Sequence, residues 1–251
     1  MSVANRREFL LSSLAMAGAA GGLLPGSLTP LAWADVLPGI EQVAPPLVKG
    51  EEQVGQKDIW ALEVRFKPVR MIVANLTNPQ TGAIQRELVW YMAYRIVVRT
   101  GSFLPDETLN TAERPLFVPE LTLVVEDEGR QRRYPDRVLP EAIPLINRRE
   151  KHIYKSSVDV VGPLPAITAD KSRQLVTLDG VATWTGVDPD TNNFAIEMAG
   201  FSNGYKVAID GQNRETVQRR TLRQKFWRPS DRFDQNEKEI RFKDEPEWFY
   251  Q

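Results

Sequence analysis

The chain has 251 residues, with 32 basic and 33 acidic side chains, and its formal net charge is −1. A balance this close to neutral provides no long-range field to attract nucleic acid or an anionic lipid surface. Because the sequence has no cysteine and only one histidine, it excludes disulfides and leaves few ligands for zinc, copper, haem or iron–sulfur centres.

The first 34 residues have the order of parts of an export signal. The basic pair Arg6-Arg7 is followed by Phe9-Leu10 and by a glycine-rich apolar run that is too short to span a membrane. Ala32-Trp33-Ala34 then offers small residues at the two positions that a signal peptidase reads. The stretch Asn5–Leu10 resembles the twin-arginine family of export signals, and the alternative is an ordinary secretory leader that carries two arginines by chance. The resemblance implies export of a folded protein to the periplasm or beyond, with residues 1–34 removed and no stable membrane span left.

Residues 35–57 are predicted to be a linker, because they are rich in proline and glycine and have no sustained period. We expect a β domain with a C-terminal strand extension over residues 58–251. Period-2 alternation begins with Trp60, Leu62, Val64 and Phe66, which predicts a strand with one buried and one wet face.

The stretch LVWYMAYRIVV, residues 88–98, is apolar on both faces of a predicted strand. Strands of this kind are usually central in a sheet and covered on both sides. We therefore expect a central strand here, with additional cover on its second face. Residues 120–134 predict a further strand, an acidic turn with glycine, and a partner strand.

Residues 136–152 are the main helical candidate, because apolar side chains such as Leu139, Ile143 and Ile146 recur at helical intervals. Pro140 and Pro144 limit the helix to short pieces. We expect one or two turns lying over a sheet edge.

The second half of the chain returns to strand patterns. Asp179-Gly180 predicts a hairpin turn or a bulge between two β-rich runs, and Asn203-Gly204 predicts a tight turn. A long, partly polar strand then runs up to Pro229, and a short last strand precedes the aromatic C-terminus.

Many short strands separated by turns, with almost no helix, predict an all-β antiparallel sandwich or barrel. The stretches WYMAYRIVVRTG, PELTLVVEDEGRQRRYPD and DGVATWTGVDPDTNNFAIEMAG resemble successive strands of immunoglobulin-like domains in exported bacterial proteins. The combination also resembles an uncharacterised family of exported bacterial proteins without an assigned activity. The resemblance covers about residues 58–209 and implies an immunoglobulin-like β-sandwich with little helix. It does not imply a function.

The sequence assigns no catalytic, cofactor-binding or metal site residues and no cofactor. His152 lies in a charged stretch and is expected on the surface. Asp188, Asp190 and Asn192 have the spacing of the first calcium-loop ligands, but Asn193 replaces the sixth-position glycine and Ala199 the twelfth-position glutamate. An ordinary interstrand turn accounts for these residues more simply.

Two groups of side chains indicate a binding role. One is a basic, aromatic strand, for which we expect an edge strand guarded by its own charges or a face for an acidic protein or polysaccharide, and not for nucleic acid: Arg214, Arg219, Arg220, Arg223, Lys225, Phe226, Trp227 and Arg228. The other group is Trp227 with Trp248, Phe249 and Tyr250, which is expected to cover the core more than to dock a ligand.

The leading expectation is an exported, non-catalytic binding or assembly module of the cell envelope. A polysaccharide hydrolase acting through two carboxylates is one alternative, since 33 acidic residues allow many pairs. A calcium-dependent adhesive domain is the other.

Overall fold

Two six-stranded sheets form the framework of the computed structural model, which describes residues 42–98, 114–127, 130–165, 176–209, 211, 213–228 and 240–251. The first sheet contains β1 (Gln42–Ala44), β2 (Glu63–Phe66), β3 (Arg70–Thr77), β4 (Ile84–Val98), β8 (Lys155–Ser156) and β10 (Val176–Trp184). The second contains β6 (Glu120–Asp127), β7 (Arg130–Pro135), β11 (Asn193–Ala199), β12 (Tyr205–Ile209), β13 (Glu215–Trp227) and β14 (Arg241–Tyr250). The remaining described elements are a two-stranded sheet of β5 (Leu116–Phe117) with β9 (Gly162–Pro163), and the helices α1 (Gly50–Gly55) and α3 (Ile143–Glu150).

Pairing between these strands is antiparallel, apart from the short parallel contact of β8 with β10. The prediction of an all-β, mainly antiparallel fold with little helix is therefore confirmed for the described residues. The described residues all belong to one compact unit, Ala34–Gln251. The predicted export signal lies outside them.

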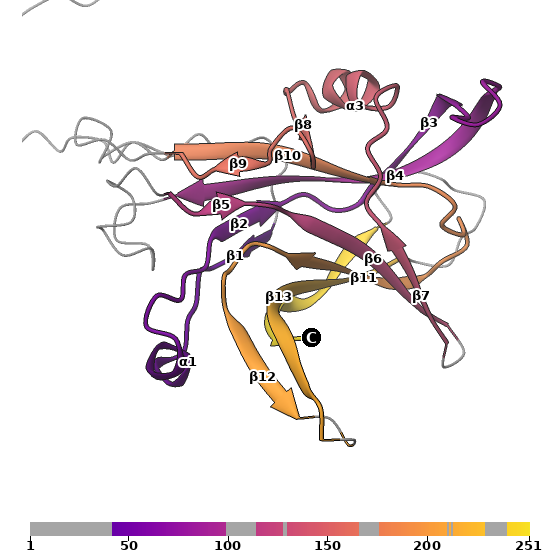
Figure 1. Ribbon diagram of the computed structural model, residues 1–251. Coiled ribbons are helices and arrows are strands. Elements are labelled where there is room, and N and C mark those ends of the chain that lie inside the picture. The colour runs from indigo at the N-terminus through magenta and orange to yellow at the C-terminus, as the bar shows by residue number, and fades with distance from the viewer. Residues whose placement is uncertain are drawn as a thin grey trace, which may run out of the picture. The chain divides into compact units, whose positions relative to one another are not determined.

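The two sheets pack face to face through a shared aromatic core (Figure 1). The ring of Trp90 on β4 lies 5.3 Å from that of Phe194 on β11, in an edge-to-face contact. Tyr94 on β4 meets Phe201 at 5.6 Å in the same geometry. Edge-to-face pairs of this kind add to the free energy that comes from burying the rings themselves. The arrangement fits a β-sandwich.

β4 is the central strand of the first sheet, as its sequence predicts. It pairs with β10 along one side and with β2 and β3 along the other. Alternate side chains from Trp90 to Val98 enter the core between the sheets. The intervening side chains Val89, Tyr91 and Ala93 belong to a second apolar cluster on the opposite face.

The helix α3 supplies the cover that this second face requires (Figure 1). Ile146 of the helix, with Leu139 and Ala142 just before it, packs against Val89 and Tyr91. Pro144 sits in the first turn, where its missing N–H costs nothing, and the helix ends at Lys151 in the left-handed conformation. The short helix is confirmed, but the expectation that it lies over a sheet edge is wrong, because its apolar side chains are buried against the sheet face.

Asp179-Gly180 does not form a turn or a bulge. Both residues lie inside β10, in continuous register with Arg95 and Tyr94 of β4. Glycine is required here because the ring of Tyr94 lies directly over Gly180, where a Cβ would be 2.4 Å from the ring carbon Cζ. The dipeptide Asp179-Gly180 is typical of turns, but here it lies within a strand, and the missing side chain of Gly180 leaves space for the ring of Tyr94.

The predicted linker 35–57 also differs from the structure in its described part, residues 42–57. β1 adds to the first sheet by pairing with β2, and Ala44 is fully buried. The short helix α1 follows, with Glu51 and Glu52 in its first turn. The sequence does not predict β1 and α1, because the prolines near residue 45 interrupt the regular spacing of apolar residues that would indicate a strand or a helix.

We predict that Gly180→Ala destabilises the protein by about 1–3 kcal/mol, because the new methyl group overlaps the buried Tyr94 ring. Thermal or denaturant unfolding measures the change. Gly162→Ala is the matched control, since a Cβ there meets no atom within 4 Å. Equal stability of the two variants would contradict the close packing described for β4 and β10.

Candidate functional site

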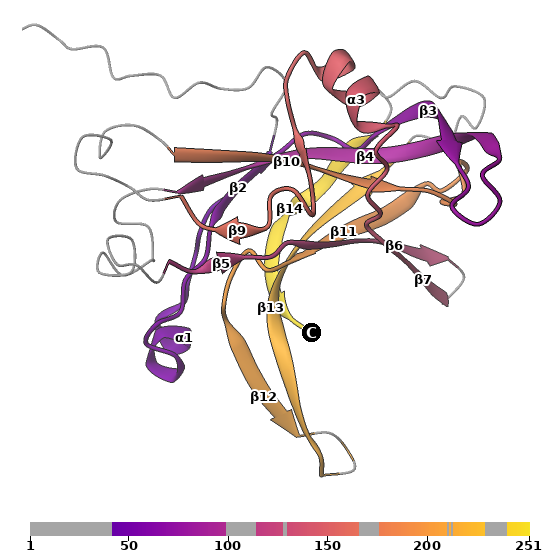
Figure 2. The ribbon, with the colours of Figure 1, turned by 45° about the horizontal axis from the view of Figure 1, so that its top comes forward.

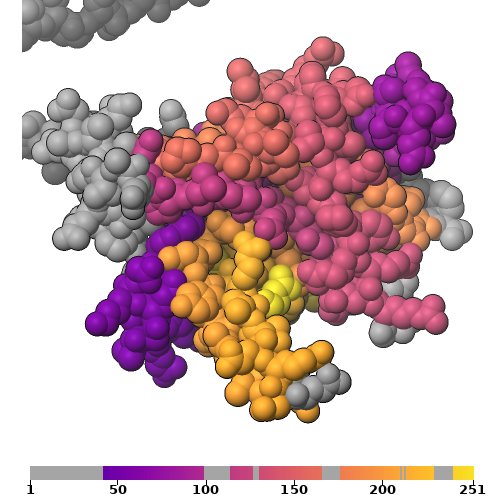
Figure 3. Space-filling model, in the orientation of Figure 1, coloured from indigo at the N-terminus to yellow at the C-terminus, as the bar shows by residue number. Residues whose placement is uncertain are grey.

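The second sheet continues beyond the sandwich as a two-stranded extension, called here the ribbon and made of Tyr205–Ile209 and Glu215–Arg219. Figures 1 and 2 both show β12 and the start of β13 extending away from the two packed sheets. In the space-filling view of Figure 3, the same orange segment protrudes from the body. An isolated two-stranded hairpin is at best marginally stable in water, so such an extension requires an explanation.

One face of the ribbon carries four large apolar side chains that are open to solvent, and the same face also carries the exposed charged residues Glu215 and Arg219. Directly paired residues share a face, so Tyr205, Val207 and Ile209 lie on the same side as Val217, the partner of Val207. Their exposed fractions are 52%, 56%, 66% and 63%. Single exposed apolar side chains are normal on protein surfaces, but a contiguous group of four large ones is typical of an interaction site.

Among the described strands, none pairs with the outer edge of the ribbon, because β12 ends the strand order of its sheet. Arg220 donates its N–H to the carbonyl of Gly204 at 2.8 Å, while Arg219 exchanges both of its backbone bonds with Gln251 on the other side. Backbone groups alternate sides along a strand. It follows that Lys206 and Ala208 bond to β13, and that Tyr205, Val207 and Ile209 direct their N–H and C=O groups outward.

The N-terminal segment covers the first of these outward groups. The side chain of Gln56 accepts a hydrogen bond from the Tyr205 N–H at 3.3 Å and donates one to the carbonyl of Asn203 at 3.2 Å. Asn203 in turn accepts from the Trp60 N–H at 2.7 Å. The open part of the β12 edge therefore begins after Tyr205.

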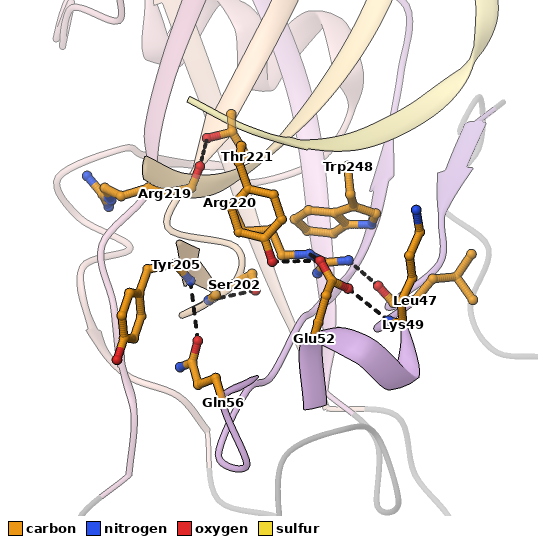
Figure 4. Close-up of polar contacts among 12 residues, drawn as sticks. Leu47, Lys49, Glu52, Gln56, Ser202, Tyr205, Arg219, Arg220, Thr221 and Trp248 are labelled. Atoms are coloured by element: carbon orange, nitrogen blue, oxygen red, sulfur yellow. Dashed lines mark hydrogen bonds and ion pairs between the residues drawn. The ribbon is translucent and has the colours of Figure 1, made fainter. Parts of the chain in front are cut away.

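At the base of the ribbon, a buried arginine ties together three distant parts of the chain (Figure 4). Arg220 is only 3% exposed, and its guanidinium lies 4.4 Å from the ring of Trp248 on β14. Its Nε donates to Glu52 of α1 at 3.2 Å, and its Nη2 donates to the carbonyl of Leu47. A charge this deeply buried is tolerated only when it is paired and hydrogen-bonded.

Glu52 is the counter-charge of this anchor, which we define as Arg220, Glu52, Tyr250 and Trp248. Its carboxylate accepts the hydroxyl of Tyr250 at 2.6 Å and the N–H of Lys49 at 2.8 Å. Burial pushes the pKa of Glu52 upward, but these hydrogen bonds and the charge of Arg220 outweigh burial and hold the pKa below its usual range. Burial and the adjacent carboxylate together raise the pKa of Tyr250 to about 12.

The basic strand predicted from the sequence is β13, and the expectation that it is an edge strand is wrong. It is flanked by β11 and β12 on one side and by β14 on the other. Its cations are paired: Arg223 contacts the buried Glu197 at 2.7 Å, and Arg219 contacts Glu120 at 2.9 Å. These charges hold neighbouring strands together rather than guarding an edge.

The four C-terminal aromatic side chains have different environments. Trp248 is half-buried against the core, and the ring of Phe249 lies 3.8 Å from the guanidinium of Arg223. The hydroxyl of Tyr250 belongs to the anchor. Trp227 is the most open, at 37% exposed. Core cover thus describes Trp248, whereas the anchor role of Tyr250 was not predicted.

His152 is half-buried rather than on the open surface where the sequence analysis put it. Its Nε2 lies 2.9 Å from Asp179, which also accepts two bonds from Arg95 at 2.6 and 3.0 Å. Arg95, the third member of this group, is a permanent cation that pairs with the Asp179 carboxylate. In a nucleophilic triad the carboxylate orients the histidine and a hydroxyl or thiol binds the other ring nitrogen of that histidine, whereas here the Asp179 carboxylate is shared between His152 and Arg95.

The Asp188 loop forms a compact turn. Asp190 donates its N–H to the Asp188 carboxylate at 2.9 Å, and Thr191 donates to the Asp188 carbonyl at 3.0 Å. Within the described ranges, no three His, Cys, Asp or Glu side chains are grouped so that they could hold a metal ion. The loop has the hydrogen bonds of an ordinary Asx turn.

No protein-family model, no curated protein and no solved structure matches the chain. Among the described residues, none of the helices is both long and apolar enough to cross a membrane.

We predict that Glu52→Gln lowers the free energy of unfolding at pH 7 by about 2 kcal/mol, because it leaves the buried guanidinium of Arg220 without a charged acceptor. The folded-state pKa of Glu52 is depressed, so its contribution is present above the unfolded value near 4.3 and disappears as pH falls through the folded pKa. Denaturant unfolding of both proteins between pH 3 and 8 should show the difference closing in acid.

The control is Glu51→Gln, the exposed neighbour in the same helical turn. An alkaline absorbance titration gives a second readout, because loss of the carboxylate charge should bring the pKa of Tyr250 below about 12. A pH-independent difference between Glu52→Gln and the parent protein would exclude the proposed role of the Glu52 charge.

Proposed function

We propose that the chain is an exported, non-catalytic binding or assembly module of the cell envelope, and that the ribbon is its docking element. The observation that carries this proposal is the row of four large apolar side chains on one open face of a two-stranded extension. Burying an exposed side chain of this size contributes about 1.5–3 kcal/mol, so four of them supply a useful docking energy.

The anchor supports this role. Docking is stronger when the docking element is held in its binding geometry beforehand, because less conformational freedom is lost. Arg220 and Gly204 lie at the point where the ribbon leaves the sandwich, and the Arg220 side chain fills the space beside Gly204, where a Cβ would be 2.7 Å from Arg220 Cδ. The base of the ribbon is thus packed rather than hinged.

The finer fold assignment is also a proposal. Two antiparallel sheets packed over an aromatic core are what an immunoglobulin-like sandwich requires. In that assignment, β13 and β14 belong to the C-terminal strand extension expected over residues 214–251, whereas β12 of the ribbon belongs to the minimal domain.

The alternative functions have less support. A glycosidase needs one carboxylic acid with a raised pKa near a second carboxylate. Glu150 is buried, and this burial is outweighed by hydrogen bonds from Lys67 and Tyr91 and by the charge of Arg70, so its pKa lies below the usual range. Glu197 is likewise held between Arg133 and Arg223. At Glu150 and Glu197 these contacts favour structural ion pairs over acid catalysis. Burial raises the pKa of Asp136, and its carboxylate accepts the N–H of Thr183 at 2.7 Å, which gives this residue a structural partner as well.

Export by the twin-arginine route predicts that residues 1–34, fused to a folded reporter protein, carry it out of the cytoplasm. Replacing Arg6 and Arg7 together by lysine should abolish this export, because the route recognises the arginine pair. Cell fractionation measures the outcome. Export that persists with the lysine pair, or that occurs only with an unfolded reporter, would refute the assignment.

Docking through the ribbon predicts that a photoreactive amino acid at Val217 forms protein adducts in intact cells. Adding Val207→Lys to the same chain should reduce the adducts at least tenfold, since a buried unpaired charge costs more than 1.4 kcal/mol. The control probe is placed at Ile84, which is 73% exposed on β4 of the other sheet. Equal adduct yields at Val217 and Ile84 would contradict the docking role.

A further inference from the structure

We propose that the ribbon docks onto a second copy of this chain, by antiparallel pairing of the two β12 edges across a two-fold axis at Ala208. This inference rests on the proposed docking role of the ribbon and adds the partner and the geometry. It follows from the backbone groups, side chains and charges along β12.

The backbone groups define which residues can pair. Val207 and Ile209 direct their N–H and C=O groups away from β13, toward the edge where the described sheet ends. Gln56 already occupies the corresponding N–H of Tyr205. An incoming antiparallel strand can therefore hydrogen-bond to the N–H and C=O groups of Val207 and Ile209. These residues are two apart, as are successive hydrogen-bonding positions along an antiparallel strand.

A second β12 fits those positions in one symmetric register. When Val207 faces Ile209 of the other copy, Ile209 faces Val207 in return, and four backbone hydrogen bonds result. Ala208 then lies opposite Ala208 as a non-hydrogen-bonded pair, the kind in which the two chains approach most closely. The smallest side chain of the strand is thus at the narrowest point.

The side chains agree with this register. Tyr205, Val207 and Ile209 of both copies, with the two Val217 side chains, would form an apolar cluster on one face of a four-stranded sheet, with Glu215 and Arg219 of each copy on the outer strands of the same face. A two-stranded hairpin alone is only marginally stable in water, whereas a sheet of four strands with an apolar face has enough strands to be stable. Each copy thus supplies the apolar strand that the other copy requires.

The charge on β12 does not oppose pairing. Lys206 is the one charged residue in the strand YKVAI, and its Nζ lies 4.2 Å from the ring of Tyr250. Natural edge strands commonly use an outward lysine, a proline or a bulge to prevent pairing. Here the lysine side chain is held over an aromatic ring, and the register does not bring it opposite the other Lys206.

Single-cysteine crosslinking of the full-length protein tests the register. The chain has no cysteine, so Ala208→Cys introduces a unique thiol. Its Cα would lie about 4.5 Å from that of its counterpart, within the range that a disulfide spans. Lys206→Cys is the matched control, because the same register separates the two copies of position 206 by four residues, or about 13 Å.

Mild oxidation should convert Ala208→Cys to a covalent dimer at least tenfold faster than Lys206→Cys. Adding Val207→Pro should abolish this dimer, because it removes an outward N–H without breaking a bond to β13. The unmodified protein should sediment as a concentration-dependent dimer.

Equal crosslinking of the two cysteine variants, with a monomeric parent protein, would overturn the inference. The photoreactive probe at Val217 separates that failure from failure of the proposed function. Adducts with a different protein at Val217 would retain the docking role with another partner, whereas yields no higher than at Ile84 would reject both proposals.

Discussion

The buried charge of Arg220 constrains the region where the ribbon leaves the sandwich. An ion taken out of water loses several kcal/mol of solvation even after the protein relaxes, and only paired, well-placed partners repay that loss. The partners come from the helix α1, from the carbonyl of Leu47 and from the ring of Trp248. Arg220 therefore holds the N-terminal segment and the last strand together where the ribbon begins.

The first sheet is organised by a different constraint, the two apolar faces of β4. A strand that is apolar on both faces is stable in water only where other elements cover both of them. The second sheet covers one face through contacts such as that of Trp90 with Phe194, and α3 covers the other through Ile146. The sandwich thus requires a helix, although helix is a small part of the described chain.

The sequence was sufficient to predict features that follow from local periodicity. The central position of β4, the need for cover on its second face and the short helix after residue 136 all come from the spacing of apolar side chains. The prediction of a turn or bulge at Asp179-Gly180 is wrong, because the role of Gly180 depends on Tyr94, which is far away in the sequence. Local turn chemistry cannot reveal a contact of that range.

The candidate site was less predictable, because its parts lie at opposite ends of the chain. Residues 42–57 have a linker-like composition, and their order depends on partners such as Arg220 and β2. The arginines of β13 indicated an edge strand because strand neighbours are not visible in a sequence. β12, which is one of the edge strands of its sheet, carries a single lysine and no other charge, so its apolar alternation resembles that of any half-buried strand.

The anchor and the free edge are physically connected through the segment around α1. Glu52 neutralises Arg220, and four residues later Gln56 occupies the outward N–H of Tyr205. The same short segment therefore stabilises the base of the ribbon and sets where its open edge begins. A longer open edge would expose more unpaired backbone and would pair with many strands, as unguarded edges do. Within the described residues the open edge spans Val207–Ile209 and offers one pair of ladder positions, and so the apolar side chains beside it must supply the selectivity.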